Sequence, residues 1–186
     1  MKIIKTAKYI KISETQKEKK DFFVKRTNEH IERVQNASKK IVDKHKEYKD
    51  LLEQVKDHDS SKFKEPEMTP YIELTWRKKD GKKSESTKEI NDATIFHVKH
   101  NMHHPEYHSD DKANIDSTNR DDSIECISAK NMDDISVAEM IADWQAVEEE
   151  LGTNATREWF NKKKDIRWSF SKKQEKLIDK LLKVFE

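Results

Sequence analysis

The chain has 186 residues, enough for one domain with a core, and its 38 Lys and Arg nearly balance its 37 Asp and Glu. This balance argues against nucleic acid or an anionic membrane as a partner, and the single cysteine, Cys126, excludes an intrachain disulfide framework. Because the sequence has neither an apolar run of ~20 residues nor the apolar core of a signal peptide, we expect a cytoplasmic protein.

The first third of the chain is predicted to be mainly helical. Residues 1–14 have no clear period, and we expect an N-terminal arm there, as a short strand, a short helix or a mobile segment. From about Thr15 to Val55, apolar residues recur at three- and four-residue steps, which indicates one amphipathic helix or two in succession. His30 lies on this apolar stripe, so its imidazole is predicted to point inward.

Two prolines, Pro66 and Pro70, then interrupt helix. The segment 71–76 is predicted to be a strand or a short helix. Residues 77–90, rich in Lys and Ser, are predicted to form an exposed loop insertion. With only two glycines and three prolines in the whole chain, we expect an all-α fold.

Five of the eight histidines lie close together in the next segment: His97, His100, His103, His104 and His108. Asn91 or Asp92 is expected to cap the helix that carries them, and Pro105 to end it. His97, Asn101 and His104 are spaced to share one helical face. Adjacent side chains on a helix diverge by about 100°, so at most two of His97, His103 and His104 could bind one metal ion. Unwinding just before Pro105 would let both His103 and His104 reach inward.

The C-terminal part begins with polar residues, 108–131, that are predicted to form a surface loop. A strong helix follows, and Gly152 is expected to stop it. Its predicted apolar face comprises Val137, Met140, Ile141, Trp144, Val147 and Leu151. Asp143 lies on that same side, where a carboxylate is costly unless it is paired or coordinated. Ser171 and Gln174 have the spacing of a capping box at the start of the last helix.

These residues suggest a metal site only in combination. Alone, His30 would more often be a hydrogen-bonded core residue, and Asp143 a buried cap or ion-pair partner. Together with the His58-Asp59 pair and the histidine cluster, they could converge on one or two divalent transition metals, Fe, Mn, Ni or Zn. The Asp59 carboxylate could bridge two ions. Lys62 could contact a phosphate oxygen, or be an ordinary surface lysine.

The order His30, His58-Asp59, Asp143 resembles the ligand order of the HD-domain metal-dependent phosphohydrolases. A closer resemblance is to an HD-like family of unknown function found in bacteria and their phages, and it covers roughly residues 22–182. Four blocks carry it: His58 to Lys62, His97 to Tyr107, Ala138 to Trp144 and Arg157 through Gln174. The resemblance implies a single all-α HD-like helical bundle over residues 15–186, with a metal centre.

The resemblance also implies which residues bind. The metal ligands would be His30, His58, Asp59 and Asp143, with His97, His103 and His104 as the additional histidines of an expanded site. Asp59, Lys62 and Glu106 are the candidate catalytic residues, and Asn101 is a candidate contact to substrate or ligands. Glu139 could be a base or a ligand if it points inward. His100 and His108 fall outside the matched pattern and are predicted to be surface residues.

We therefore expect a phosphohydrolase that uses metal-activated water on a small phosphorylated molecule, such as a nucleotide. Three alternatives stay open. The same scaffold could hold two irons and use oxygen, or it could bind a metal or nucleotide without chemistry, as a regulator or a phage-encoded sequestering protein. The histidines could also be purely structural.

Overall fold

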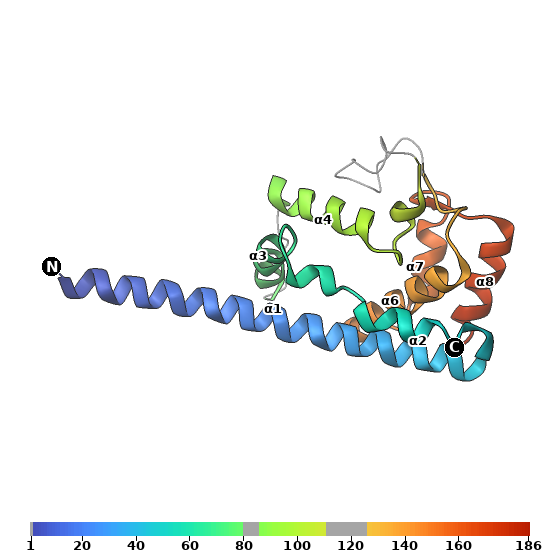
Figure 1. Ribbon diagram of the computed structural model, residues 1–186, viewed down its shortest axis with the longest axis horizontal. Coiled ribbons are helices and arrows are strands. Elements are labelled where there is room, and N and C mark those ends of the chain that lie inside the picture. Colours follow the sequence, from blue (N-terminus) through green and yellow to red (C-terminus); the bar gives the residue numbers. More distant parts are fainter. Residues whose placement is uncertain (1, 80–85, 111–125) are drawn as a thin grey trace.

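A single long helix, α1 (Lys2–Lys44), runs the length of the protein, and α2, α3 and α6 pack against it (Figure 1). The computed structural model describes residues 2–79, 86–110 and 126–186, and the side chains from Thr15 onward. Helix therefore begins well before Thr15 and includes nearly all of the predicted arm. The N-terminal end of α1, blue in Figure 1, extends beyond the rest of the protein.

After α1 the chain returns alongside it in short helical steps. These are the 3-10 helix η1 (Lys46–Tyr48), α2 (Leu51–Gln54) and the 3-10 helices η2 (Val55–Asp57) and η3 (Ser60–Phe63). The apolar stripe predicted as far as Val55 is thus divided between two helical stretches, because His45 leaves helical geometry at φ −136° and ψ 79°. Both α2 and η2 contact α1, and this places the connection between η2 and η3 close to its middle.

The helices α3 (Met68–Lys78) and α4 (Lys88–His100) form the next layer. The segment 71–76 is helical rather than extended, and only part of the loop predicted at 77–90 is non-helical; residues 80–85 lie outside the described part. The N-cap of α4 is Thr87, whose side chain accepts a hydrogen bond from the Ile90 amide. The caps predicted at Asn91 and Asp92 were therefore wrong, because the helix begins one turn earlier.

A short parallel pairing joins two distant segments of the chain. Strand β1 (Ile127–Ser128) pairs with β2 (Trp168–Ser169), with Ile127 opposite Trp168. Before β1, the 3-10 helix η4 (Pro105–His108) ends the histidine segment. The surface loop predicted for 108–131 was wrong at Ile127 and Ala129, which are buried. Residues 111–125 lie outside the described part.

Helix α6 (Asp134–Leu151) is the centre of the fold and packs more extensively on α1 than any other element does. Asp133 caps it by accepting hydrogen bonds from the Ile135 and Ser136 amides at 3.0 and 2.9 Å. Gly152 ends it with φ 71°, a left-handed conformation that glycine adopts without steric cost. The predicted apolar face was wrong at its C-terminal end, where Val147 is 41% exposed and Leu151 66% exposed.

The C-terminal helices α7 (Thr156–Lys163) and α8 (Lys172–Leu182) complete the core. Ser171 and Gln174 form the predicted capping box at the start of α8. Leu177, Ile178 and Leu181 face α6, and the stacked rings of Trp144 and Trp168 lie 5.5 Å apart between α6 and β2. Apart from the β1–β2 pairing, the described residues form one all-α domain, as predicted.

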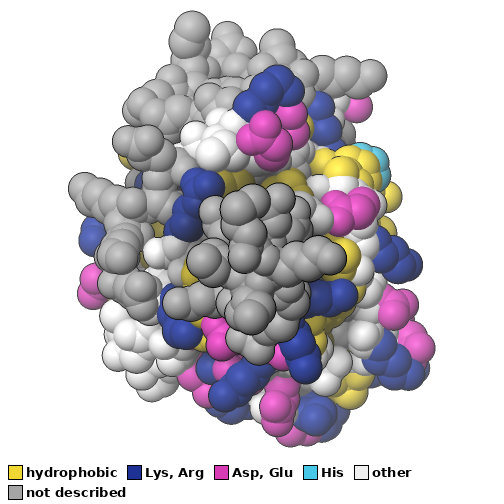
Figure 2. Space-filling view, turned by 90° about the vertical axis from the view of Figure 1, so that its left-hand side faces the viewer, with side chains coloured by type: hydrophobic (Ala, Val, Ile, Leu, Met, Phe, Trp, Pro, Cys, Tyr) yellow, Lys and Arg dark blue, Asp and Glu magenta, His cyan; other side chains and the backbone are white. Residues whose placement is uncertain are grey.

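Charges of both signs are mixed on the face seen along α1. Viewed along α1, Lys and Arg side chains alternate with Asp and Glu side chains (Figure 2). No helix among the described residues is long and apolar enough to cross a membrane.

Candidate metal centre

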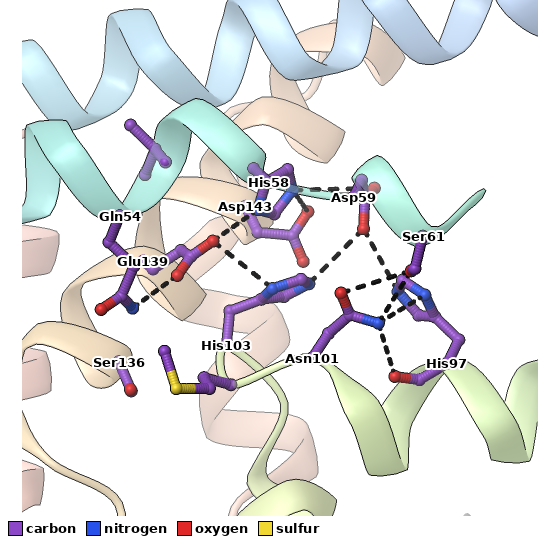
Figure 3. Close-up of polar contacts among 12 residues, drawn as sticks. Gln54, His58, Asp59, Ser61, His97, Asn101, His103, Ser136, Glu139 and Asp143 are labelled. Carbon is purple, nitrogen blue, oxygen red and sulfur yellow. Dashed lines mark hydrogen bonds and ion pairs between the residues drawn. The ribbon is translucent and has the colours of Figure 1, made fainter. Parts of the chain in front are cut away.

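Four separate segments bring imidazoles and carboxylates to one point inside the fold. His30 comes from α1, and His58 and Asp59 come from the connection between η2 and η3. His97 lies in the last turn of α4, and Asp143 lies in the middle of α6. Two further histidines, His103 and His104, belong to the turn after α4. Figure 3 shows most of these side chains pointing toward one another.

Asp59 is at the centre of this arrangement and is 1% exposed. Its Oδ2 atom lies 3.7 Å from Nε2 of His30 and 3.6 Å from Nε2 of His58. Its Oδ1 atom lies 3.2 Å from Nε2 of His97 and 3.7 Å from Nε2 of His103. The two oxygens of one carboxylate therefore face two different pairs of imidazoles.

Two sets of potential metal ligands lie on either side of Asp59. In the first, site A, His30, His58 and Asp143 offer ligand atoms within 4.8 Å of one another. In the second, site B, the same holds for His97, His103 and His104. A third group, His58, Asp59 and His103, links the two. In site A, Oδ1 of Asp143 lies 3.0 Å from Nε2 of His30.

Buried carboxylates orient the imidazoles from outside the centre. Nδ1 of His58 lies 2.8 Å from Oε1 of Glu139, and Nδ1 of His97 lies 2.7 Å from Oε2 of Glu67. Nδ1 of His103 lies 3.5 Å from the same Glu139 oxygen. A carboxylate beside Nδ1 favours the ring proton there and leaves Nε2 available with its lone pair, as in histidines that bind metals.

Asn101 connects the two chain segments that contribute most ligands. As the C-cap residue of α4, it donates from Nδ2 to the His97 carbonyl at 2.8 Å and to Oγ of Ser61 at 3.1 Å. Ser61 follows Asp59 by two residues, so these bonds tie the end of α4 to the start of η3. Asn101 itself is not among the grouped ligands.

The backbone of Asp59 is in the left-handed region, at φ 57° and ψ 11°. Only a few per cent of non-glycine residues adopt positive φ, and such conformations recur at functional sites. The turn lets successive residues, His58 and Asp59, both point into the centre, which a regular helix would prevent.

The electrostatics of the buried groups suit a cation. Burial opposes the charge of Asp59, but attraction by the Lys62 ammonium, and then by His58, holds the pKa of Asp59 well below its usual value. Burial likewise opposes the charge of Glu139, yet hydrogen bonds from His103 and His58 lower its pKa to about 2. The pKa of His58 is lowered, chiefly by burial. At neutral pH, the centre therefore combines ionised carboxylates with a neutral His58.

One buried atom indicates that a metal ion fits. Nε2 of His58 has no hydrogen-bond partner among the described residues, although it lies 3.6 and 3.9 Å from oxygens of Asp59 and Asp143. With the ring proton on Nδ1, a lone pair faces two carboxylates, and a cation between them would relieve this repulsion. Imidazole and carboxylate ligands suit Fe, Mn, Ni or Zn.

The structure brings together all seven residues expected to bind metal. Helix α4 ends at His100, before Pro105, so His103 and His104 lie in an unwound turn and both reach site B. His100 instead stacks on Phe96, and His108 bonds to the Met102 carbonyl, both outside the grouped ligands.

The other expected residues have different positions. Lys62 pairs with Asp59 at 2.5 Å and lines a cavity of about 350 Å³ beside the centre. Glu139 orients two histidines and is not among the grouped ligands. Glu106, expected to be catalytic, is buried elsewhere: its Oε1 accepts a hydrogen bond from the Trp168 indole at 3.1 Å, and the residue does not line the cavity.

Two residues near the centre were missed in the sequence. Glu67, which is fully buried, was obscured by its position between Pro66 and Pro70, a segment that reads as a break in helix. Tyr71 lines the cavity, and its ring lies 5.9 Å from that of His97. Burial raises the pKa of Tyr71 to about 12, so its hydroxyl stays protonated. No periodicity or motif in the sequence distinguishes either residue.

Comparison with known proteins shows which family the chain belongs to. A family model described as a family of unknown function, DUF5662, matches residues 19–184. The chain belongs to this family. The segment that matches DUF5662 contains every residue of the centre, from His30 to Asp143. No curated protein and no solved structure matches the chain.

Proposed function

We propose that this protein is a metal-dependent phosphohydrolase that acts on a small phosphorylated molecule such as a nucleotide. The observation that carries the proposal is the position of Asp59, whose two oxygens face site A and site B separately. A carboxylate so placed can bridge two metal ions. Paired ions clamp the attacking and leaving oxygens in many enzymes that displace phosphoryl groups.

The ligand order adds support. His30, His58-Asp59 and Asp143 follow one another as in the HD-domain phosphohydrolases, and here they lie within ion-pair distance of one another. We accordingly propose that the chain is a divergent HD-like protein.

Each residue of the centre would have a distinct role in binding the metal ions or the substrate. One ion would be held in site A by His30, His58 and Asp143. A second ion would be held in site B by His97, His103 and His104. Asp59 would contribute to both sites. Divalent metals held there would supply a water of lowered pKa and neutralise charge on the phosphoryl group. Lys62, held by Asp59 and exposed to the cavity, would donate a hydrogen bond to a phosphate oxygen. Glu139 and Glu67 would keep the imidazoles oriented.

The first test is elemental analysis of the untagged protein, of Asp59→Ala and of His108→Ala as the matched control. We expect about one or two equivalents of Fe, Mn, Ni or Zn in the wild type and in the control, and a loss in Asp59→Ala with the helical circular dichroism retained. No metal in any of the three, even after reconstitution, would contradict the proposal.

The second test is phosphate release from a panel of nucleotides and other phosphomonoesters by the reconstituted protein. Turnover that is lost in Asp59→Ala and kept in His108→Ala is the expected result. Retained metal without turnover on any phosphoester would favour a protein that binds without chemistry. Bound iron with an optical band that changes on adding oxygen would favour an oxygenase.

A further inference from the structure

The cavity beside the metal centre has a second end, formed by the same helices. On α1, Arg26 lines the cavity one turn before His30. On α6, Glu150 lines it two turns after Asp143. Arg26 and Glu150 meet across the cavity, with Nε of Arg26 2.6 Å from Oε1 of Glu150. At 1.5 Å per residue, this far end is about 6–10 Å from the metal ligands along the helix axes.

Helix α3 forms the third side of the cavity and, like α6, leads from the metal centre toward the far end. Tyr71 lies at the inner end, where Nζ of Lys62 is 5.7 Å from the centroid of the Tyr71 ring. Leu74 and Lys78 follow at three and seven residues, on the same face of α3, and both line the cavity. Lys78 therefore lies at the far end, with Arg26.

The far end has an excess of positive charge. Among the residues that line this end, Arg26 and Lys78 are cationic, and Glu150, 2.6 Å from Arg26, is the one carboxylate. The same carboxylate is also approached at 3.9 Å by Arg33, which does not line the cavity. Lys78 has no ion-pair partner among the residues that the structure describes. Partial burial lowers the pKa of Lys78, and the nearby positive charge of Arg26 lowers it further. Two like charges that face the same space are stabilised by an anion between them.

The walls between the two ends are largely apolar. Leu74 and Val147 line the middle of the cavity from α3 and α6. Val147 is 41% exposed, whereas Met140, Ile141 and Trp144 earlier on the same helix face are buried. An apolar middle between two polar ends is typical of small-molecule sites, which fix a ligand by a few polar groups.

From this arrangement we infer that the substrate is a short molecule with two anionic groups. Its phosphoryl group would lie at the metal centre, and a second phosphate or a carboxylate, about 6–10 Å away along the helices, would be bound by Lys78 and Arg26. This inference rests on the proposed function for the position of the phosphoryl group. A cavity of about 350 Å³ has the volume of a small-molecule site.

Binding of phosphonates tests the inference without any turnover, because their carbon–phosphorus bonds are not hydrolysed by phosphatase chemistry. Calorimetric titration of the metal-loaded protein would use α,ω-alkanediphosphonates from propane to hexane and the matching alkyl monophosphonates. We expect one spacer length at which the diphosphonate binds at least about tenfold more tightly than the matching monophosphonate. This is the gain in affinity expected from one added charged hydrogen bond. A parallel series of ω-carboxyalkylphosphonates distinguishes a second phosphate from a carboxylate.

Variants assign the gain to the far end. In Lys78→Ala the diphosphonate should bind no more tightly than the monophosphonate. The affinity for the monophosphonate should be the same as in the wild type. Lys79→Ala is the matched control, since Lys79 ends the same helix but packs on the Trp76 and Phe22 rings and does not line the cavity. Equal affinity of mono- and diphosphonates at every length, or a gain that survives in Lys78→Ala, would overturn the inference even if phosphoesters are hydrolysed. Failure of the proposed function would be seen separately, as absence of hydrolysis.

Discussion

Glu139 and His58 form a buried pair in which Oε1 of Glu139 lies 2.8 Å from Nδ1 of His58. The same oxygen lies 3.5 Å from Nδ1 of His103. His58 belongs to site A and His103 to site B, so one carboxylate orients a ligand in each. Gln54 donates a hydrogen bond to the other oxygen of Glu139 at 2.6 Å, which fixes the carboxylate in turn.

The first prediction concerns this shared carboxylate. Glu139→Gln should weaken metal binding by about 10–100-fold, because the substitution removes the charge that sets the ring tautomers of both histidines. Competition with a chromophoric chelator measures the change. Glu149→Gln, on an exposed face of the same helix, should bind like the wild type. Unchanged affinity in Glu139→Gln would show that the Glu139 charge is not needed for ligand orientation.

Site A and site B should lose their ions independently. Asp143→Ala removes a ligand found only in site A, and His97→Ala removes one found only in site B. Each variant should therefore retain about one equivalent where the wild type holds two, and Asp59→Ala should retain less than either. Elemental analysis at matched protein concentration gives the stoichiometry. Identical losses in all three variants would indicate a single ion.

Removal of metal should destabilise the protein. A ligand present at 100 times its dissociation constant stabilises the native state by about 2.7 kcal/mol. For a domain of this size, that corresponds to a fall of roughly 5–10 °C in Tm. Thermal unfolding with and without a chelator measures the difference. The chelator should have no effect on Asp59→Ala, and an equal effect on the variant would indicate that the ion binds elsewhere.

The N-cap of α6 should be important for stability, because this helix carries both Glu139 and Asp143. Asp133→Ala removes the acceptor for the Ile135 and Ser136 amides and should lower the free energy of unfolding by about 1 kcal/mol. Urea denaturation measures this. Asp134→Ala, which breaks an exposed ion pair with Lys173, should cost less than about 0.5 kcal/mol.

The effect of this cap should also depend on pH. Burial opposes the charge of Asp133, but hydrogen bonds from Ser136 and Ile135 lower its pKa in the folded state. The contribution of Asp133 to the free energy of unfolding is therefore complete above its unfolded-state pKa of about 3.9. It is lost as the pH falls through the lower pKa of the folded state. The difference between wild type and Asp133→Ala should shrink in that acidic window. A constant difference would contradict a role for the ionised side chain.

Local signals in the sequence were sufficient for the helices, where they agree with the tertiary structure. Ser171 and Gln174 predicted the start of α8 because a capping box is a purely local contact, and Gly152 predicted the end of α6 for a similar reason. The positions of β1 and of Val147 could not be predicted from local pattern, because they depend on distant partners. Ile127 pairs with Trp168, and Val147 faces a cavity whose other walls come from α1, α3 and α4.

The residues of the site show the same distinction. His30, His58, Asp59 and Asp143 could be named because their order resembles a known ligand order, and the turn before Pro105 explained how His103 and His104 both reach site B. Glu67 lies thirty residues from His97 along the chain, and its contact with that ring exists only after folding. Glu106 does not line the cavity, because a neighbour of a histidine motif in sequence can point into the core, where it meets Trp168.

The ligands of the centre come from four segments spread along the chain, from α1 to α6. In the unfolded chain, bringing them together would require closing several long loops at once, each with an entropic cost. Ions held at this centre would therefore bind late in folding, after α4 and α6 have docked. An ion in site A would link α1, the segment after η2 and α6, and an ion in site B would link the end of α4 to Asp59. Metal uptake would in this way report that the chain has reached its native topology.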